Sequence, residues 1–160
     1  MPVLIDPNVQ GNAVHGAIDV IRLDYAGSNY DNTLSGIFSS SDLKIDGSNK
    51  KFKLSGNPST IPDYYVGCGL YTEGQLRKIS SYNAATSVIE LLDSQPDFSP
   101  APTALSAYQI TPYVEINGDG ENAYARALVN SASSNSIYKI EIIGRGENYS
   151  FANVFVVTNT

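Results

Sequence analysis

The chain has 160 residues and a formal net charge of −6, with one Cys, one His and no Trp. A chain of this length can bury a core without disulfides or metals, and the single cysteine, Cys68, is expected to be a small buried side chain. The single imidazole, His15, excludes multi-His zinc and iron sites. The acidic balance and the lack of a long apolar stretch argue against nucleic acid and membranes as partners.

Charge is unevenly distributed along the sequence. Residues 40–80 carry six Lys or Arg and four Asp or Glu, a balance of +2, and the rest of the chain carries −8. This favours a separate unit inserted into an acidic surround, although a basic face of one domain is the alternative. We predict a first β repeat over 1–38, an inserted β subdomain over 39–98 and a second β repeat over 99–160 that packs with the first.

The two ends of the chain match each other when the sequence is shifted by 119 residues. The matched positions are Ile18, Ile21, Leu23, Gly27, Asn29 and Tyr30 with Ile137, Ile140, Ile142, Gly146, Asn148 and Tyr149. Each copy is expected to be an apolar strand followed by a turn of sequence Gly-x-Asn-Tyr. Gly adopts a positive φ freely and Asn tolerates it, so Gly27, Asn29, Gly146 and Asn148 are predicted to be structural turn residues.

The middle of the chain also has the pattern of β-strands. Residues 51–54 alternate between polar and apolar side chains, and residues 64–66 and 70–71 are rich in Tyr, Val and Leu. Residues 76–82 and 87–92 are separated by a four-residue connection, which is a common hairpin loop length. We therefore expect these segments to form strands, with the last two paired as a hairpin.

Two further strands are predicted near the C-terminal end, over residues 110–116 and 123–128. Residues 117–122, which connect them, begin like an EF-hand loop but have neither Gly at the sixth position nor Glu at the twelfth. A hairpin turn with Gly118 and Gly120 as structural turn residues is the main expectation, and an irregular cation site is the alternative.

No segment shows a helical period over more than three turns, so the predicted fold is all-β. We expect two short repeated β units at the chain ends that flank an inserted small β-barrel or β-sandwich-like segment. This arrangement follows from the self-match of the ends and from the change in charge and composition in the middle.

The residues that could carry chemistry form no recognisable catalytic set. Asp119 with Glu121 is the nearest pair of carboxylates, but both lie in a Gly-rich turn where polar residues are expected for structural reasons. His15 could act as a general base, but a surface or subunit-contact histidine is the main interpretation. We therefore predict a protein that is not an enzyme, with no catalytic and no metal-binding residues.

Basic and tyrosine side chains are the candidates for contacts with a partner. Tyrosine provides a large amphipathic contact area, and the basic residues of the middle segment could meet an acidic neighbour. The candidate interface or ligand contacts are Lys50, Lys51, Lys53, Tyr64, Tyr65, Tyr71, Arg77, Lys78 and Tyr149. Packing within a β core is the alternative for many of the tyrosines.

Two segments resemble modules of tailed-bacteriophage virion proteins. The first consists of Pro112-Tyr113-Val114-Glu115-Ile116-Asn117-Gly118-Asp119-Gly120, then Ala123, Ala125 and Ala127, then Ile137, Ile140 and Ile142, and then Gly146, Asn148, Tyr149, Ala152 and Val154. The second runs from Phe52 to Thr86 and includes Tyr65-Val66-Gly67-Cys68 and Gly74-Gln75. The first looks most like the baseplate wedge proteins of T4-like contractile tails, and the second is similar to another recurring phage β element.

The resemblance implies a structural role in assembly, without cofactor or turnover and without catalytic residues. It implies contacts with other virion proteins, in a homo-oligomer or a wedge hetero-complex, and localisation in a virion that is assembled in the bacterial host cytoplasm. Wedge proteins are longer than this chain, so we expect a fragment or a minimal version. The alternative is a glycan-binding module of a phage host-recognition or adhesin protein, which predicts exposed tyrosines beside Asn and Asp.

Overall fold

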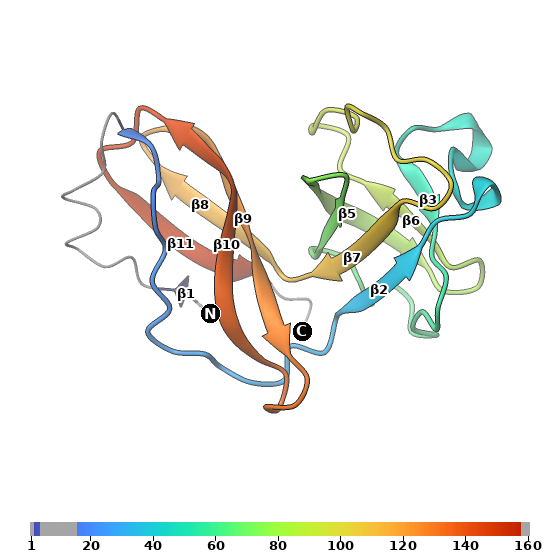
Figure 1. Ribbon diagram of the computed structural model, residues 1–160, viewed down its shortest axis with the longest axis horizontal. Coiled ribbons are helices and arrows are strands. Elements are labelled where there is room, and N and C mark those ends of the chain that lie inside the picture. The colour runs from blue at the N-terminus through green and yellow to red at the C-terminus, as the bar shows by residue number, and fades with distance from the viewer. Residues whose placement is uncertain (1, 4–15, 158–160) are drawn as a thin grey trace. The chain divides into compact units, whose positions relative to one another are not determined.

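The computed structural model describes residues 2–3 and 16–157 (Figure 1). Apart from two short 3₁₀ turns, the regular structure of these residues is entirely strand, which confirms the predicted all-β fold. The chain divides into two compact units: unit 1 contains Met1–Asp31 and Pro112–Thr158, and unit 2 contains residues 32–111. Within residues 2–3 and 16–157, there is no helix with the length and hydrophobicity of a transmembrane segment.

The unit boundaries differ from those predicted at residues 38/39 and 98/99. Strands β2 (Leu34–Ile37) and β7 (Ala107–Thr111), which the sequence assigned to the terminal repeats, pair with each other in antiparallel register. Both strands belong to unit 2, so the middle unit extends further in both directions than the charge pattern indicated.

Unit 2 is built on one curled sheet of six strands in the order β2-β7-β4-β5-β6-β3. Its other elements are η2 (Ser40–Asp42), η3 (Ile45–Gly47), β3 (Lys51–Lys53), β4 (Gly69–Thr72), β5 (Gln75–Asn83) and β6 (Val88–Leu91). All neighbouring strands are antiparallel, and β5 and β6 form the predicted hairpin. A register shift between Ile79 and Ser81 bends β5, as β-bulges do, where it pairs with β6.

The core of unit 2 is aromatic. Phe38 stacks on Tyr108 with 4.4 Å between ring centroids, and Phe52 lies 5.4 Å from Phe38. Residues 64–66, predicted as a strand, lie in turns instead. The reason is local, because Asp63 and Gly67 on either side have φ of 57° and 86°, which an extended chain does not allow.

Unit 1 contains a five-stranded sheet in the order β1-β11-β8-β9-β10. Its strands are β1 (Pro2–Val3), β8 (Tyr113–Gly118), β9 (Glu121–Asn130), β10 (Ser136–Glu147) and β11 (Ala152–Val157). The connection between β8 and β9 is the predicted hairpin turn. Its core is mostly aliphatic with Tyr30 and Tyr149 packed into it, and Ala125 and Ala127 of β9 are fully buried there.

The matched segments 16–30 and 135–149 exchange backbone hydrogen bonds reciprocally. Two pairs of hydrogen bonds are interconverted by the shift of 119 residues: Ile18 N to Arg145 O (2.8 Å) with Ile137 N to Ala26 O (3.0 Å), and Tyr149 N to Gly16 O (2.8 Å) with Tyr30 N to Asn135 O (3.1 Å). Each segment therefore uses the same groups toward the other, as two strands related by a local two-fold axis do.

The Gly-x-Asn turns have the same conformation in both copies. Gly27 and Gly146 have φ of 62° and 64°, and Asn29 and Asn148 have φ of 63° and 62°. The copies differ in their apolar segments, because residues 17–23 form no strand while the matched residues lie in β10. The first copy is hydrogen-bonded to β10 through Ile18 and Ala26, so the expected strand is replaced by an irregular segment along the sheet edge.

Candidate functional site

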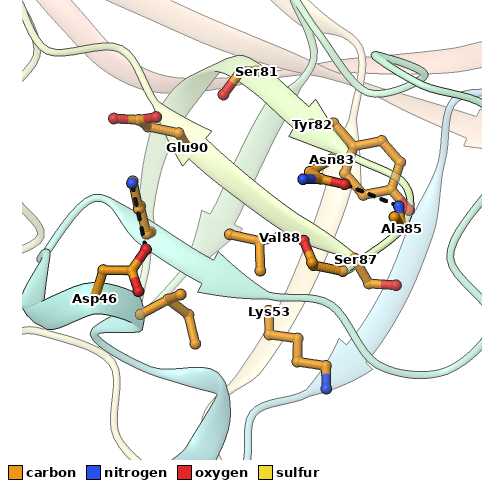
Figure 2. A pocket seen from close by; sticks show the side chains of 12 residues that line it. Asp46, Lys53, Ser81, Tyr82, Asn83, Ala85, Ser87, Val88 and Glu90 are labelled. Carbon is orange, nitrogen blue, oxygen red and sulfur yellow. Dashed lines mark hydrogen bonds and ion pairs between the residues drawn. The ribbon is translucent and has the colours of Figure 1, made fainter.

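A groove of about 790 Å³ lies on the outer face of β3, β5 and β6 in unit 2 (Figure 2). Strand alternation places its charged side chains. Phe52 points into the core, so Lys51 and Lys53 on either side of it point outward, and Glu90 is directed outward between the buried Ile89 and Leu91. Residues of η3 and of the β5–β6 turn complete the lining.

The groove combines charges of both signs with hydroxyl and amide groups. Lys51 Nζ lies 3.6 Å from Asp46 Oδ2, and Lys51 is also the register partner of Glu90. Figure 2 shows Lys53 directed away from these acidic side chains, and Lys53 forms no ion pair with any described residue. Asn83 Oδ1 accepts a hydrogen bond from Ala85 N at 3.0 Å, which orders the turn at the end of the groove.

Two other basic residues of the predicted contact set hold the segment 95–98 within unit 2. Lys50 Nζ lies 3.3 Å from Asp97 Oδ1 and donates a hydrogen bond to Gln95 O. Arg77 Nε donates to Pro96 O at 2.7 Å, and its guanidinium carbon lies 5.1 Å from the centroid of the Phe98 ring. Both side chains therefore fasten this segment within unit 2.

Lys78 lies beside the same segment. Its backbone N donates to Gln95 Oε1 at 2.6 Å, and its side chain is half-buried. Of the five predicted basic contacts, the structure therefore brings Lys51 and Lys53 together at one groove and leaves the other three at the attachment of residues 95–98.

The predicted tyrosine contacts are not gathered on one exposed surface. Tyr65 and Tyr149 are 2% and 7% exposed, so their expected place on a contact surface is wrong. Tyr65 Oη accepts a hydrogen bond from Ser59 N at 2.9 Å, and Tyr149 packs in the aliphatic core of unit 1. Tyr64 and Tyr71 are half-buried.

The tyrosines that do lie at the surface were not singled out from the sequence. Tyr25 and Tyr138 are 68% and 61% exposed, and the hydrogen bond between Ile137 N and Ala26 O brings their backbones close together. Tyr138 lies at a register shift in β10, between Ile137 and Lys139, so strand alternation does not assign its side chain to a face.

Asp119 has a structural role in unit 1. Its carboxylate accepts hydrogen bonds from Ser150 N at 2.9 Å and Phe151 N at 3.2 Å, and also from the Ser150 hydroxyl. These hydrogen bonds, first among them that of the Ser150 side chain, lower the pKa of Asp119 to about 2. The side chain links the β8–β9 turn to the β10–β11 connection, in agreement with the structural interpretation of this turn.

The remaining candidates from the sequence are Cys68, a metal site and His15. Cys68 is buried, and burial raises the pKa of its thiol to about 12, as expected for a small core side chain. Within residues 16–157, no group of three His, Cys, Asp or Glu side chains is placed to hold a metal ion. His15 lies outside the described residues.

These features define an all-β protein of two compact units, one of which carries a polar groove of mixed charge. Comparison of the chain with protein-family models, with curated protein sequences and with solved structures finds no match. The groove and its charges are therefore the basis for a functional proposal.

Proposed function

We propose that this chain is a non-enzymatic structural module of a bacteriophage virion, in the tail baseplate wedge, that acts through contacts with other virion proteins. The proposal rests on Lys53. This residue lies in the groove on β3, the edge strand of the unit 2 sheet, and has no acidic partner among the described residues. The resemblance of the C-terminal segment to baseplate wedge proteins supplies the virion context.

The groove fits a polypeptide segment that carries an acidic side chain. Lys51 lies beside Asp46 and is the register partner of Glu90, whereas Lys53 is directed away from both acids, so Lys53 provides the charge that attracts the partner. Ser81, Asn83 and Ser87 add hydroxyl and amide groups that can pair with the polar backbone of an extended chain. Charge complementarity of this kind selects the partner and accelerates association more than it raises affinity.

The test is the incorporation of charge-reversed chains into phage particles. In a phage that encodes this chain, we expect purified particles to contain it in a fixed ratio to the other tail proteins. Lys53→Glu should lower that ratio by about threefold or more, because it places an acid against the acidic partner. Lys139→Glu, an equal charge change on an exposed residue of β10, is the control and should leave the ratio unchanged.

Two results would contradict the proposal. Purified particles that lack the chain would exclude a place in the virion. Equal incorporation of the Lys53→Glu and Lys139→Glu chains would exclude the groove as the docking site. Thermal unfolding of both variants separates a loss of docking from a loss of folding.

A glycan-binding module is the second candidate, and the exposed Tyr25 and Tyr138 favour it. Their backbones are neighbours, and aromatic rings at a surface provide apolar faces with polar tips. Titration of the chain with soluble bacterial surface glycans should then perturb tyrosine fluorescence, and the Tyr25→Ala and Tyr138→Ala variants should lose the response. A flat titration of the wild-type chain would reject this candidate.

A further inference from the structure

Unit 2 has a leucine at a turn position where the backbone conformation favours glycine or asparagine. Leu105 has φ of 79° and is 83% exposed. The other non-glycine residues with positive φ among the described residues are Asn, Asp, Ser, Lys and Glu. A leucine in this backbone conformation lowers the stability of the folded state, and its exposed side chain adds no buried apolar area. Gly or Asn would adopt the same conformation at lower cost.

The surrounding backbone holds Leu105 in a fixed position. Leu105 N donates to Phe38 O at 2.8 Å, and Phe38 N donates to Ser106 O at 3.0 Å. Ile37, the residue before Phe38, is also exposed and is the register partner of Ala107. Leu105, Ile37 and Ala107 are thus exposed apolar residues on neighbouring backbone at the end of β2 and β7, and we name this group the Leu105 knob.

Unit 2 also contains an apolar pocket of about 580 Å³, which we name the Phe98 pocket. Its apolar lining consists of Leu43, Phe52, Phe98, Ala101 and Pro102, and its polar lining of Ser40, Lys44, Asn49 and Asp97. The exposure of Leu105 shows that the knob does not fill the pocket of its own chain. A leucine side chain is smaller than this volume, so a knob from outside can enter it.

We infer that the Leu105 knob of one copy docks into the Phe98 pocket of a second copy of this chain. The two surfaces match in polarity, since both are apolar at the centre. They also match in charge. Glu73 accepts a hydrogen bond from Ser106 beside the knob, and Lys44 at the pocket forms no ion pair with any described residue.

The knob and the pocket are formed by different residues of unit 2, and each copy carries both. Two copies can therefore exchange knobs reciprocally, as in a two-fold dimer, or each copy can give its knob to one neighbour and receive that of another, as in a ring or filament. The inference is independent of the groove and of the proposed virion role, because it involves neither Lys51 nor Lys53.

Sedimentation of the full chain over a range of concentrations tests the inference. The wild type should form oligomers as concentration rises. Leu105→Asn should weaken association by about tenfold or more, because it removes the apolar side chain at the centre of the contact. Its thermal unfolding temperature should be unchanged or higher, because Asn tolerates a positive φ. The control is Ile61→Ser, which removes a comparably exposed apolar side chain elsewhere in unit 2 and should not change association.

A mixing experiment tests the direction of docking. Ala101→Trp places a bulky ring in the pocket and should also abolish self-association. A mixture of the Leu105→Asn chain, which keeps an open pocket, with the Ala101→Trp chain, which keeps a knob, should form a one-to-one complex. Three results would overturn the inference: a wild type that stays monomeric at every concentration, a Leu105→Asn chain that associates like the wild type, or a mixture of folded variants without complex formation.

Discussion

The two units of this chain build their cores from different side chains. In unit 2, Phe38, Phe52 and Tyr108 contact one another through their rings, and long aromatic side chains fill the interior of a curled sheet. In unit 1, the small residues Ala125 and Ala127 lie at the centre of the core among Ile and Val side chains. Both cores are closely packed. We expect the aromatic core of unit 2 to be destabilised most by smaller side chains, and the alanine-centred core of unit 1 by larger ones.

The units also differ in how they use polar groups. In unit 2, the side chains of Lys50 and Arg77 hold the segment 95–98 through its carbonyl groups. In unit 1, the backbone groups of the two matched segments pair directly. Basic side chains thus donate hydrogen bonds to the carbonyl groups of an irregular segment of the same unit. The sequence alone does not distinguish this structural role from a role in binding a partner.

The largest expected effect comes from removing a ring of the aromatic core. Phe38→Ala should lower the free energy of unfolding by about 3–5 kcal/mol, because the rings of Phe52 and Tyr108 lose a buried partner. Chemical denaturation measures the change. Phe155→Ala, which removes a partly exposed ring from β11 of unit 1, is the control and should cost much less. Equal losses would show that unit 2 does not depend on its aromatic cluster.

The next effect tests the left-handed turns of the matched segments. Gly146→Ala should cost about 1–2 kcal/mol for the backbone conformation. It should cost about 1–3 kcal/mol more for crowding, because the new Cβ would lie 2.5 Å from Glu121 O. Gly47→Ala in unit 2 has a similar φ of 75° but open space around it, and should show only the first cost. If both variants lose the same stability, the close packing around Gly146 is not restrictive.

Enlarging the small core of unit 1 should have a somewhat smaller effect. Ala127→Leu should destabilise the chain by about 1–3 kcal/mol, because a fully buried position must accept three more carbon atoms. The same change at Ala132, which lies exposed in the turn between β9 and β10, should leave thermal unfolding nearly unchanged. A stable Ala127→Leu chain would mean that the sheet and the segment 16–31 can separate without cost.

The smallest effect is the pH dependence contributed by Asp119. Its pKa is lowered from 3.8 to about 2 in the folded chain, so the folded state favours the ionised carboxylate. This stabilisation is complete above pH 4 and is lost as the pH falls through 2. Asp119→Asn should reduce stability at pH 7 and flatten the decline between pH 4 and 2. Ser150→Ala, which removes a donor, should give a weaker form of the same change, and unaltered pH profiles in both would contradict the assignment.

Strand positions could be predicted where alternation is strict. Residues 51–54 and the hairpin around residues 83–87 are found as expected, because each strand has one face in the core. Residues 17–23 have the same apolar pattern but do not form a strand. Their partner β10 provides hydrogen bonds only at Ile18 and Ala26, so tertiary pairing overrides the local pattern.

The candidate site was less predictable than the fold. Lys51 and Lys53 could be assigned to a surface because Phe52 between them must be buried. The groove itself depends on η3 and on the β5–β6 turn, whose approach to β3 no local pattern indicates. Leu105 could not be recognised from the sequence at all, because its importance lies in a backbone angle that a leucine rarely adopts.

The reciprocal hydrogen bonds of unit 1 have a consequence for folding during synthesis. Unit 2 is continuous in sequence, so all of its strands are available once residue 111 has left the ribosome. Residue 18 must wait for residue 145, and residue 16 for residue 149. Because chains are made from the N-terminus and distant contacts form slowly, unit 1 closes only after unit 2 can already be folded. Residues 16–18 are therefore made before unit 2 but reach their final hydrogen-bond partners after it.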